Sequence, residues 1–278
     1  MRSRPWRRVA RRGLALLGLL LIGGFAGQLT PRDPLRVVAG DRLKAPGALL
    51  RDGRIAVLGT DGVGRDVLSR IITGTRLSLL IGLSSVGVAG ALGTGFGLAS
   101  GYFGGRLGDA IMRLVDVQMA FPAVLLALAI AAALGPSVLT LVLALGVSYW
   151  TSYARLARGI VLSIKEREYV LAAVVGGASS ARILLRHVLP NALNPVMILA
   201  SLHLGQMIIA EASLSYLGLG IQPPAISWGG MIADGRSYLG SAWWAATFPG
   251  LAIAATVLIM GRFGDSVRDA LDPRFRFE

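Results

Sequence analysis

Long apolar segments, nearly free of charge, alternate along this chain with short polar stretches. A helix crosses the hydrocarbon core of a membrane with roughly 20 apolar residues, and lipid leaves the backbone no hydrogen-bond partner except itself. The segments are close to that length. They lie at residues 14–29, 77–100, 111–134, 138–156, 195–217 and 243–263. The pattern predicts an all-α polytopic membrane protein with six transmembrane helices.

The composition agrees with this prediction. Of the 278 residues, 54% are hydrophobic and 15% are charged, and the mean hydropathy is +0.65. A soluble domain of this size needs a more polar surface. The chain has no cysteine, which excludes disulfides and thiolate metal sites. The net charge is +13, but much of it lies beside the apolar segments as topogenic charge does, so we expect no nucleic-acid partner.

The distribution of Lys and Arg predicts the orientation. With the N-terminus in the cytoplasm, the inner segments hold 18 of these residues and the outer segments hold 10, in line with the positive-inside tendency. We therefore expect a basic cytoplasmic N-terminus at residues 1–13 and a cytoplasmic tail at residues 264–278. The extracytoplasmic loop at residues 30–76, with nine basic residues, is the exception.

Residues 1–29 have a second interpretation. Basic residues followed by a short apolar run are also typical of a secretory signal peptide. Residues 25–28, Phe-Ala-Gly-Gln, offer no convincing small-x-small cleavage site. We expect residues 14–29 to be a retained first membrane span.

The loop at residues 30–76 contains candidate polar residues. Asp61 precedes Gly62, a pair that signals a tight turn. Residues 66–72 then read as a short amphipathic helix on the membrane surface. Asp61, Arg65 and Asp66 are candidates for the extracytoplasmic entrance of a pathway. A structured loop without a ligand is the alternative.

Small residues, charges and prolines predict how the spans pack. Gly93, Gly97 and Gly101 recur every four residues, which predicts a close approach by another helix. Arg113 and Asp116 have the i, i+3 spacing of an ion pair on one helix face. Pro122 and Pro249 remove helix hydrogen bonds and should kink their spans.

The most informative segment is the cytoplasmic loop at residues 164–194, which reads as two short helices with a break. Glu168 begins a helix that runs to residue 175, and Gly176–Gly177 ends it, because glycine accepts the left-handed conformation. Ser179 or Ser180 caps the second helix, Pro190 stops it, and Asn194–Pro195 begins the next span. The segment is too apolar for a solvated loop, and a short apolar helix suits a groove on another protein.

The residues of this loop resemble the "EAA" loop of binding-protein-dependent ABC permeases. The matching residues are Ala172, Ala173, Gly177, Leu189 and Pro190. In that family, the loop docks into a cleft on the ATP-hydrolysing subunit and transmits its closure.

Four further residues of the loop bear on this resemblance. Leu171 stands where the family has Glu, and Glu168, one turn earlier, is a candidate substitute. Arg186 and His187 belong to a stretch typical of the peptide branch. The resemblance makes all of these residues candidates for coupling to the ATPase.

Further stretches are similar to the dipeptide/oligopeptide/nickel branch and its C-type subunits. They lie at residues 58–66, 101–105, 186–191, 211–220, 222–229 and 268–274. The resemblance implies a type I importer transmembrane domain at residues 75–268 in the cell (inner) membrane. It implies two ABC ATPases that hold ATP and Mg, a second permease that is usually a different chain, and an extracytoplasmic binding protein. It implies no cofactor in this chain. The resemblance implies a solute that is a peptide or, within the same branch, nickel or a metal chelate.

A membrane-embedded enzyme and an ion-coupled transporter are the two alternative classes. A membrane-embedded enzyme needs a nucleophile–base constellation, which the sequence lacks, and His187 and His203 alone predict no metal site. An ion-coupled transporter usually has mid-membrane charges and internal repeats. Glu211 is the one acid well inside a predicted span, where it either bonds a neighbouring helix or lines the pathway.

Overall fold

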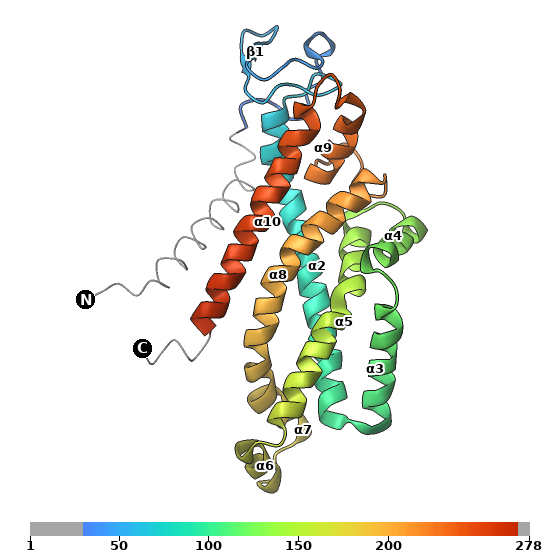
Figure 1. Ribbon diagram of the computed structural model, residues 1–278, viewed down its shortest axis with the longest axis vertical. Helices are drawn as coiled ribbons and strands as arrows, with labels where there is room; N and C mark the ends of the chain where they lie inside the picture. Colours follow the sequence, from blue (N-terminus) through green and yellow to red (C-terminus); the bar gives the residue numbers. More distant parts are fainter. Residues whose placement is uncertain (1–29, 272–278) are drawn as a thin grey trace, which may run out of the picture.

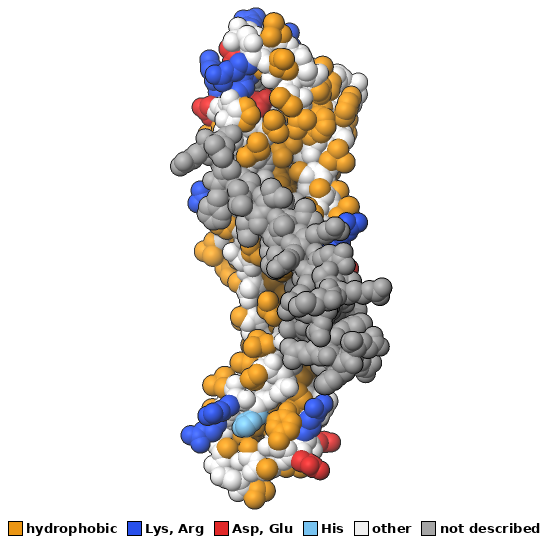
Figure 2. All heavy atoms as spheres, turned by 90° about the vertical axis from the view of Figure 1, so that its left-hand side faces the viewer, with side chains coloured by type: hydrophobic (Ala, Val, Ile, Leu, Met, Phe, Trp, Pro, Cys, Tyr) orange, Lys and Arg blue, Asp and Glu red, His pale blue; other side chains and the backbone are white. Residues whose placement is uncertain are grey.

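The computed structural model describes residues 30–271, with side chains through residue 266. The predicted span at residues 14–29 and the last residues of the predicted tail lie outside this range. The described chain is almost entirely helical and forms an elongated bundle (Figure 1). Figure 2 shows apolar side chains over much of the described surface of one face of the bundle, with most charged groups toward its two ends.

Four long helices form the bundle. They are α2 (Val67–Phe103), α5 (Val138–Ile164), α8 (Leu189–Tyr216) and α10 (Trp244–Leu271). Shorter elements are α3 (Gly105–Met119), α4 (Ala123–Leu134), α6 (Glu168–Val175), α7 (Ser180–Ile183), the π-helical turn η3 (Leu184–Val188), α9 (Trp228–Gly235) and the 3-10 turn η4 (Arg236–Tyr238).

Residues 30–66 form a loop cap at one end of the bundle, at the top of Figure 1. They contain the 3-10 turn η2 (Ala39–Asp41) and a small antiparallel hairpin of β1 (Ala48–Leu49) and β2 (Ile55–Ala56). Indole groups fasten the loop cap and α9 to the bundle. Trp244 Nε1 donates to the carbonyl O of Thr60 at 3.0 Å, and Trp228 Nε1 donates to the carbonyl O of Ile71 at 3.0 Å.

The predicted glycine ridge is confirmed, and its partner is α5. A Cβ at Gly93 would overlap the carbonyl O of Trp150, and a Cβ at Gly97 would overlap that of Ala154. A Cβ at Gly101 would lie 2.7 Å from Cβ of Val161. Glycine at these positions lets the two backbones approach as membrane helices do.

The segment predicted as one span at residues 111–134 is two helices. Helices α3 and α4 meet at a bend of 89°. Pro122 N-caps α4 with an extended ψ of 124°, and it has no N–H with which to continue a helix. The predicted kink at Pro122 is therefore a complete break, whereas Pro249 lies inside α10 without interrupting it.

Three described helices are long and apolar enough to cross a membrane, and the bent pair α3–α4 makes a fourth. The three are α2, the helical stretch from Ser180 to Tyr216, and α10 as far as Ser266. Helix α5 is not among them, because Ser, Tyr, Trp and Thr residues fill its middle at residues 148–153 and two arginines, Arg155 and Arg158, follow. The fold is thus a helical membrane bundle, and the predicted number of six spans is not confirmed.

Two sequence-based boundaries are wrong. Residues 66–72 are not a separate surface helix, because Asp66 caps α2 and the helix continues unbroken to Phe103. Pro190 does not end a helix and Pro195 does not begin one, because both lie within α8. The π-helical turn before α8 accommodates Pro190, since a wider turn rearranges the hydrogen bonds that proline cannot make.

Candidate functional site

The cytoplasmic loop predicted at residues 164–194, called the elbow below, protrudes at the end of the bundle opposite the loop cap (Figure 1). Helix α6 has the predicted bounds. Gly177 follows it with φ +76°, and its N–H donates to the carbonyl O of Val174 at 3.0 Å. Ser179 then caps α7 by accepting from the N–H of Arg182. The break is therefore built from local signals that the sequence displays.

One set of apolar side chains fixes the elbow to the bundle. Val170, Ile183 and Val188 are fully buried and pack with Val161 and Ile164 at the end of α5. The cluster is separate from the larger cores of the bundle. Burial of such side chains contributes about 1.5–3 kcal/mol each, so the elbow has a defined position relative to α5.

A second set of apolar side chains on the elbow has no cover within the described chain. Val175 is 89% exposed, Val174 52% and Leu171 50%, and Leu185 and Tyr169 are exposed as well. Ala172 is exposed between them, and Ala173 is half-buried. We call this set of side chains, residues 169, 171, 172, 174, 175 and 185, the apolar elbow face. Exposed apolar side chains gathered on one short element are typical of an interaction site.

The remaining candidate residues of the elbow lie around this face. Glu168 begins α6 and is exposed, and so is Arg186. The ring of His187 lies 6.3 Å from that of Tyr169. Asn191 Nδ2 donates to the carbonyl O of His187 at 2.7 Å and to Tyr169 Oη at 3.4 Å. Leu189 and Pro190 open α8 directly below, so the structure brings the predicted coupling residues together.

The predicted polar residues of the loop cap are engaged in contacts within the subunit. Arg65 Nε and Arg70 Nη1 both pair with Asp61 Oδ2, the former at 2.7 Å. The same two arginines pair with Asp234 Oδ2 of α9 at 3.1 and 3.2 Å. Two positive and two negative charges thus compensate one another and join the loop cap, α2 and α9.

The electrostatics of Asp61 follow from this cluster. Asp61 is only 5% exposed, and burial alone would raise its pKa. The charge of Arg70, the backbone N–H groups of Arg65 and Val63, and the charge of Arg65 outweigh burial and lower the pKa of Asp61 below its usual value. The carboxylate is therefore ionised at neutral pH.

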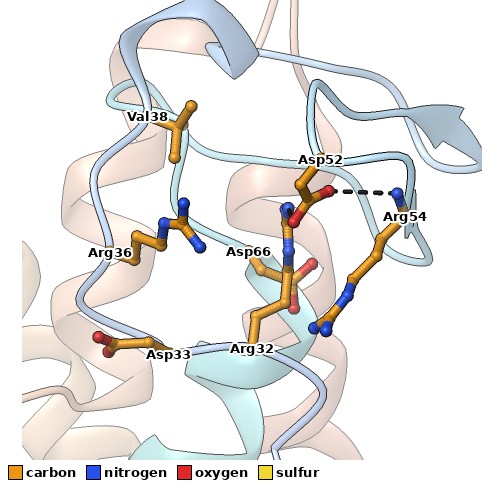
Figure 3. Close-up of a pocket in the computed structure, with 8 residues that line it drawn as sticks. Arg32, Asp33, Arg36, Val38, Asp52, Arg54 and Asp66 are labelled. Carbon is orange, nitrogen blue, oxygen red and sulfur yellow. Dashed lines mark hydrogen bonds and ion pairs between the residues drawn. The ribbon is translucent and has the colours of Figure 1, made fainter.

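Asp66 lines a small cavity of about 60 Å³ in the loop cap (Figure 3). Three arginines and three aspartates surround it, so their charges balance. The lining residues are Arg32, Asp33, Arg36, Val38, Asp52, Arg54, Gly64 and Asp66. Asp52 pairs with Arg32 and accepts from the N–H of Arg54 at 3.1 Å. Asp66 accepts from the N–H of Ser69 at 2.8 Å, so its carboxylate serves the start of α2.

Glu211 lies in α8 beneath α9, because a Cβ at Gly229 of α9 would lie only 2.6 Å from Cα of Ala212. Ser215 Oγ donates to Glu211 Oε1 at 2.7 Å. Glu211 is 1% exposed, and the side chain of Ser227 at the start of α9 also interacts with its carboxylate. No ion pair or hydrogen bond among the described residues joins Glu211 to Asp61, Arg65 or Asp66.

Sequence reasoning missed several polar contacts. Asp234 was not a candidate, because its partner Arg65 lies 169 residues away and no local pattern links them. Asp116 pairs with Arg155 at 2.8 Å and not with the predicted Arg113, because α3 packs against α5. Among the described residues, no group of His, Cys, Asp or Glu is arranged to hold a metal ion.

Comparison with known proteins identifies the family. Residues 93–277 match the family of binding-protein-dependent transport system inner membrane components. The chain belongs to this family. The permease is 42% identical to the di/tripeptide transport system permease protein DppC of Pseudomonas aeruginosa, over 98% of this chain and 91% of the relative. It is 41% identical to the probable D,D-dipeptide transport system permease protein DdpC of Escherichia coli, over 92% and 84%.

Other relatives extend the comparison. The permease is 40% identical to the glutathione transport system permease protein GsiD of Pectobacterium atrosepticum, over 98% of this chain and 92% of the relative. Its fold is similar to a chain of the inward-facing MetNI methionine ABC transporter, with a TM-score of 0.59 and 17% identity over 73% of this chain and 96% of that chain.

The predicted resemblance is thus confirmed. The protein is a transmembrane permease subunit of an ABC importer, and the ATPase of such an importer is a separate subunit. It works with ATPase subunits, a second permease and a binding protein. The alternatives of a membrane enzyme and an ion-coupled transporter are excluded by this membership. The region that matches the family includes the elbow and leaves out the loop cap.

Proposed function

We propose that this permease imports short peptides, and that its elbow transmits closure of the ATPase subunits to the membrane helices. The names of the relatives, which include di/tripeptide, D,D-dipeptide and glutathione permeases, support a solute of two or three residues. The observation that supports the mechanical role most strongly is the apolar elbow face, exposed beside a buried set that fixes the elbow to α5.

Each part of the elbow has a proposed role. Leu171, Ala172, Val174 and Val175 enter a groove on the ATPase, as a short apolar helix does. Gly177 sets the bend, and Glu168, Arg186 and His187 give the rim its charge and hydrogen bonds. The helical stretch from α7 through Leu189 and Pro190 into α8 moves α8 when the elbow moves, which is how a rigid element converts closure into alternating access.

This mechanism assigns the orientation. The elbow lies in the cytoplasm with both chain termini, and the loop cap lies on the extracytoplasmic side, where the binding protein delivers the solute. ATP and Mg belong to two partner ATPases, and the second permease is a different homologous chain.

The function is tested by uptake. The complete importer, with its binding protein, is reconstituted into vesicles and supplied with a labelled dipeptide and ATP. We expect uptake that stops when the ATPase cannot hydrolyse ATP and that ignores collapse of the proton gradient. Thermal shift of the binding protein with dipeptide, glutathione and nickel identifies the solute. Stabilisation by nickel alone would contradict import of peptides.

A further inference from the structure

Helix α8 has a stripe of exposed side chains on a single face. Leu202, Ile209 and Tyr216 are roughly half exposed, and Gln206 and Ser213 lie between them. The spacing of four and three residues places all five on one line along the helix. We call these five residues the α8 stripe.

Gln206 is the informative member of the stripe. It is exposed, and its amide makes no hydrogen bond to another residue in the described part of the chain. It lies at the centre of the apolar segment at residues 195–217, about 16 Å along the helix from either end, which is about half the thickness of the hydrocarbon core. An amide at that depth costs several kcal/mol when it faces lipid without a partner. The face with Gln206 therefore lies against protein or water.

The sizes of the side chains favour water. Membrane helices that pack tightly use small residues at the contact. Apart from Ser213, the stripe instead presents Leu, Gln, Ile and Tyr, which hold another helix at a distance. Ile209, Ser213 and Tyr216 also line an open cavity of about 460 Å³ with Ile232 of α9 and Ile253 of α10, within the roughly 300–1,000 Å³ typical of small-molecule sites.

The end of the stripe next to the loop cap has a positive charge. Arg236 is exposed, its Cζ lies 5.2 Å from the centre of the Tyr216 ring, and its Nη1 donates to the carbonyl O of Tyr216 at 2.9 Å. It has no carboxylate partner among the described residues. A guanidinium in this position suits a carboxylate that arrives from outside. At its other end, α8 continues into the elbow, so the stripe moves when the elbow moves.

We propose that the α8 stripe and Arg236 form the wall that the transported solute touches, with Gln206 as a hydrogen-bonding group at the middle of the membrane. The solute class is a short chain with amide groups and a free carboxylate. Arg236 pairs with the carboxylate of the solute at the extracytoplasmic end. Nearer the middle of the membrane, the side-chain amide of Gln206 forms a hydrogen bond with a peptide group of the solute in place of water. This assignment rests on the proposed function and adds the residues that contact the solute.

Thiol accessibility tests the assignment, because the chain has no cysteine of its own. Gln206→Cys in the complete reconstituted importer is treated with a membrane-impermeant methanethiosulfonate, and the mass of this subunit is measured. The control is Leu258→Cys, 68% exposed on α10. Since only the hydrated thiolate reacts, we expect Gln206→Cys to react at least about tenfold faster than the control, and a dipeptide-loaded binding protein to slow the reaction.

If both thiols reacted equally slowly with the methanethiosulfonate, the stripe would face lipid. If Gln206→Cys could be cross-linked to the second permease but did not react with the methanethiosulfonate, the stripe would lie in a dry contact between the two permeases. Either result overturns the proposal. Ser213→Cys, farther along the same stripe, is the second probe if Gln206→Cys does not assemble. Uptake by Gln206→Leu should fall about tenfold, the scale of one hydrogen bond, with ATP hydrolysis retained. Absent uptake by the unmodified importer would instead refute the proposed function.

Discussion

The loop cap and the elbow lie at opposite ends of the same bundle, and they differ in whether the side chains that could bind a partner already have partners within the subunit. In the loop cap, Asp61, Arg65, Arg70 and Asp234 neutralise one another. In the elbow, only part of the apolar surface is buried, and the apolar elbow face, with Val175 at 89% exposure, is left open. The charged cluster of the loop cap is compensated within one subunit. The apolar elbow face has no cover within the described chain, and we expect a partner to cover it.

The largest expected effect belongs to the compensated cluster. Asp61→Asn removes one buried charge and leaves Arg65 and Arg70 with Asp234 alone. Breaking a buried ion pair costs about 3 kcal/mol, and we expect the solubilised subunit to lose about that much free energy of unfolding. Chemical denaturation of the two proteins measures it. Asp33→Asn, at an exposed position in the same loop cap, should change the free energy of unfolding little. Equal losses in both variants would show that the charge pairing of Asp61 with Arg65 and Arg70 is not what stabilises the loop cap.

The bend of the elbow should be the next most sensitive feature. Gly177→Val puts a β-branched residue at φ +76°, which costs about 2 kcal/mol of backbone strain and displaces α6 from α7. We expect insertion into the membrane to persist while uptake falls and ATP hydrolysis becomes uncoupled from it. Gly176→Ala is the matched control, because Gly176 has φ −71°. Normal uptake by Gly177→Val would remove the bend from the coupling mechanism.

A charge on the exposed face should affect assembly alone. Val175→Asp would leave the stability of the subunit nearly unchanged, because the side chain touches little of it. Association with the ATPase should weaken about tenfold, since the charge would be buried unpaired at the contact. Co-purification at graded ATPase concentrations measures the loss. Val57→Asp in the loop cap, where Val57 is 55% exposed, should leave association with the ATPase unchanged. If both variants weakened this association equally, the elbow would not differ from the loop cap as a binding surface for the ATPase.

The smallest expected effect is a pH dependence of the loop cap. The pKa of Asp61 is lowered in the folded state, so its contribution is present at pH values above the unfolded pKa of about 3.9 and is lost as the pH falls through the folded pKa. Thermal unfolding between pH 7 and pH 3 should show a steeper acid loss for the wild type than for Asp61→Asn. Parallel profiles would mean that Asp61 is not held in its charged form by these arginines.

Local signals explain what the sequence predicted well. Helix α6 was predicted to the residue, because Gly177 and Ser179 act on their own neighbours. The ridge at Gly93, Gly97 and Gly101 predicted a close contact with another helix, but the sequence did not indicate that this helix is α5. The family resemblance was visible because the motifs of the elbow are contiguous in the chain.

Tertiary context explains the failures. The segment predicted as one span breaks at Pro122 into two helices that meet at 89°. The sequence indicates a kink at a proline but does not predict its angle. The sequence predicts helix boundaries at Pro190 and Pro195, yet α8 contains both, and a π-helical turn precedes Pro190. The pairing of Arg65 and Arg70 with α9 depends on Asp234, which only the folded chain brings near.

Cross-linking from Val175→Cys tests the central claim most directly. The engineered thiol is unique in this chain, and a short bifunctional reagent is applied to the assembled importer in membranes, with Leu239→Cys near α9 as the control. The account predicts one product from position 175, a covalent adduct with the ATPase subunit, and none with the ATPase from position 239. A thiol at position 175 that stays free, or that joins only lipid-facing neighbours, would contradict the claim that the apolar elbow face is covered by the ATPase.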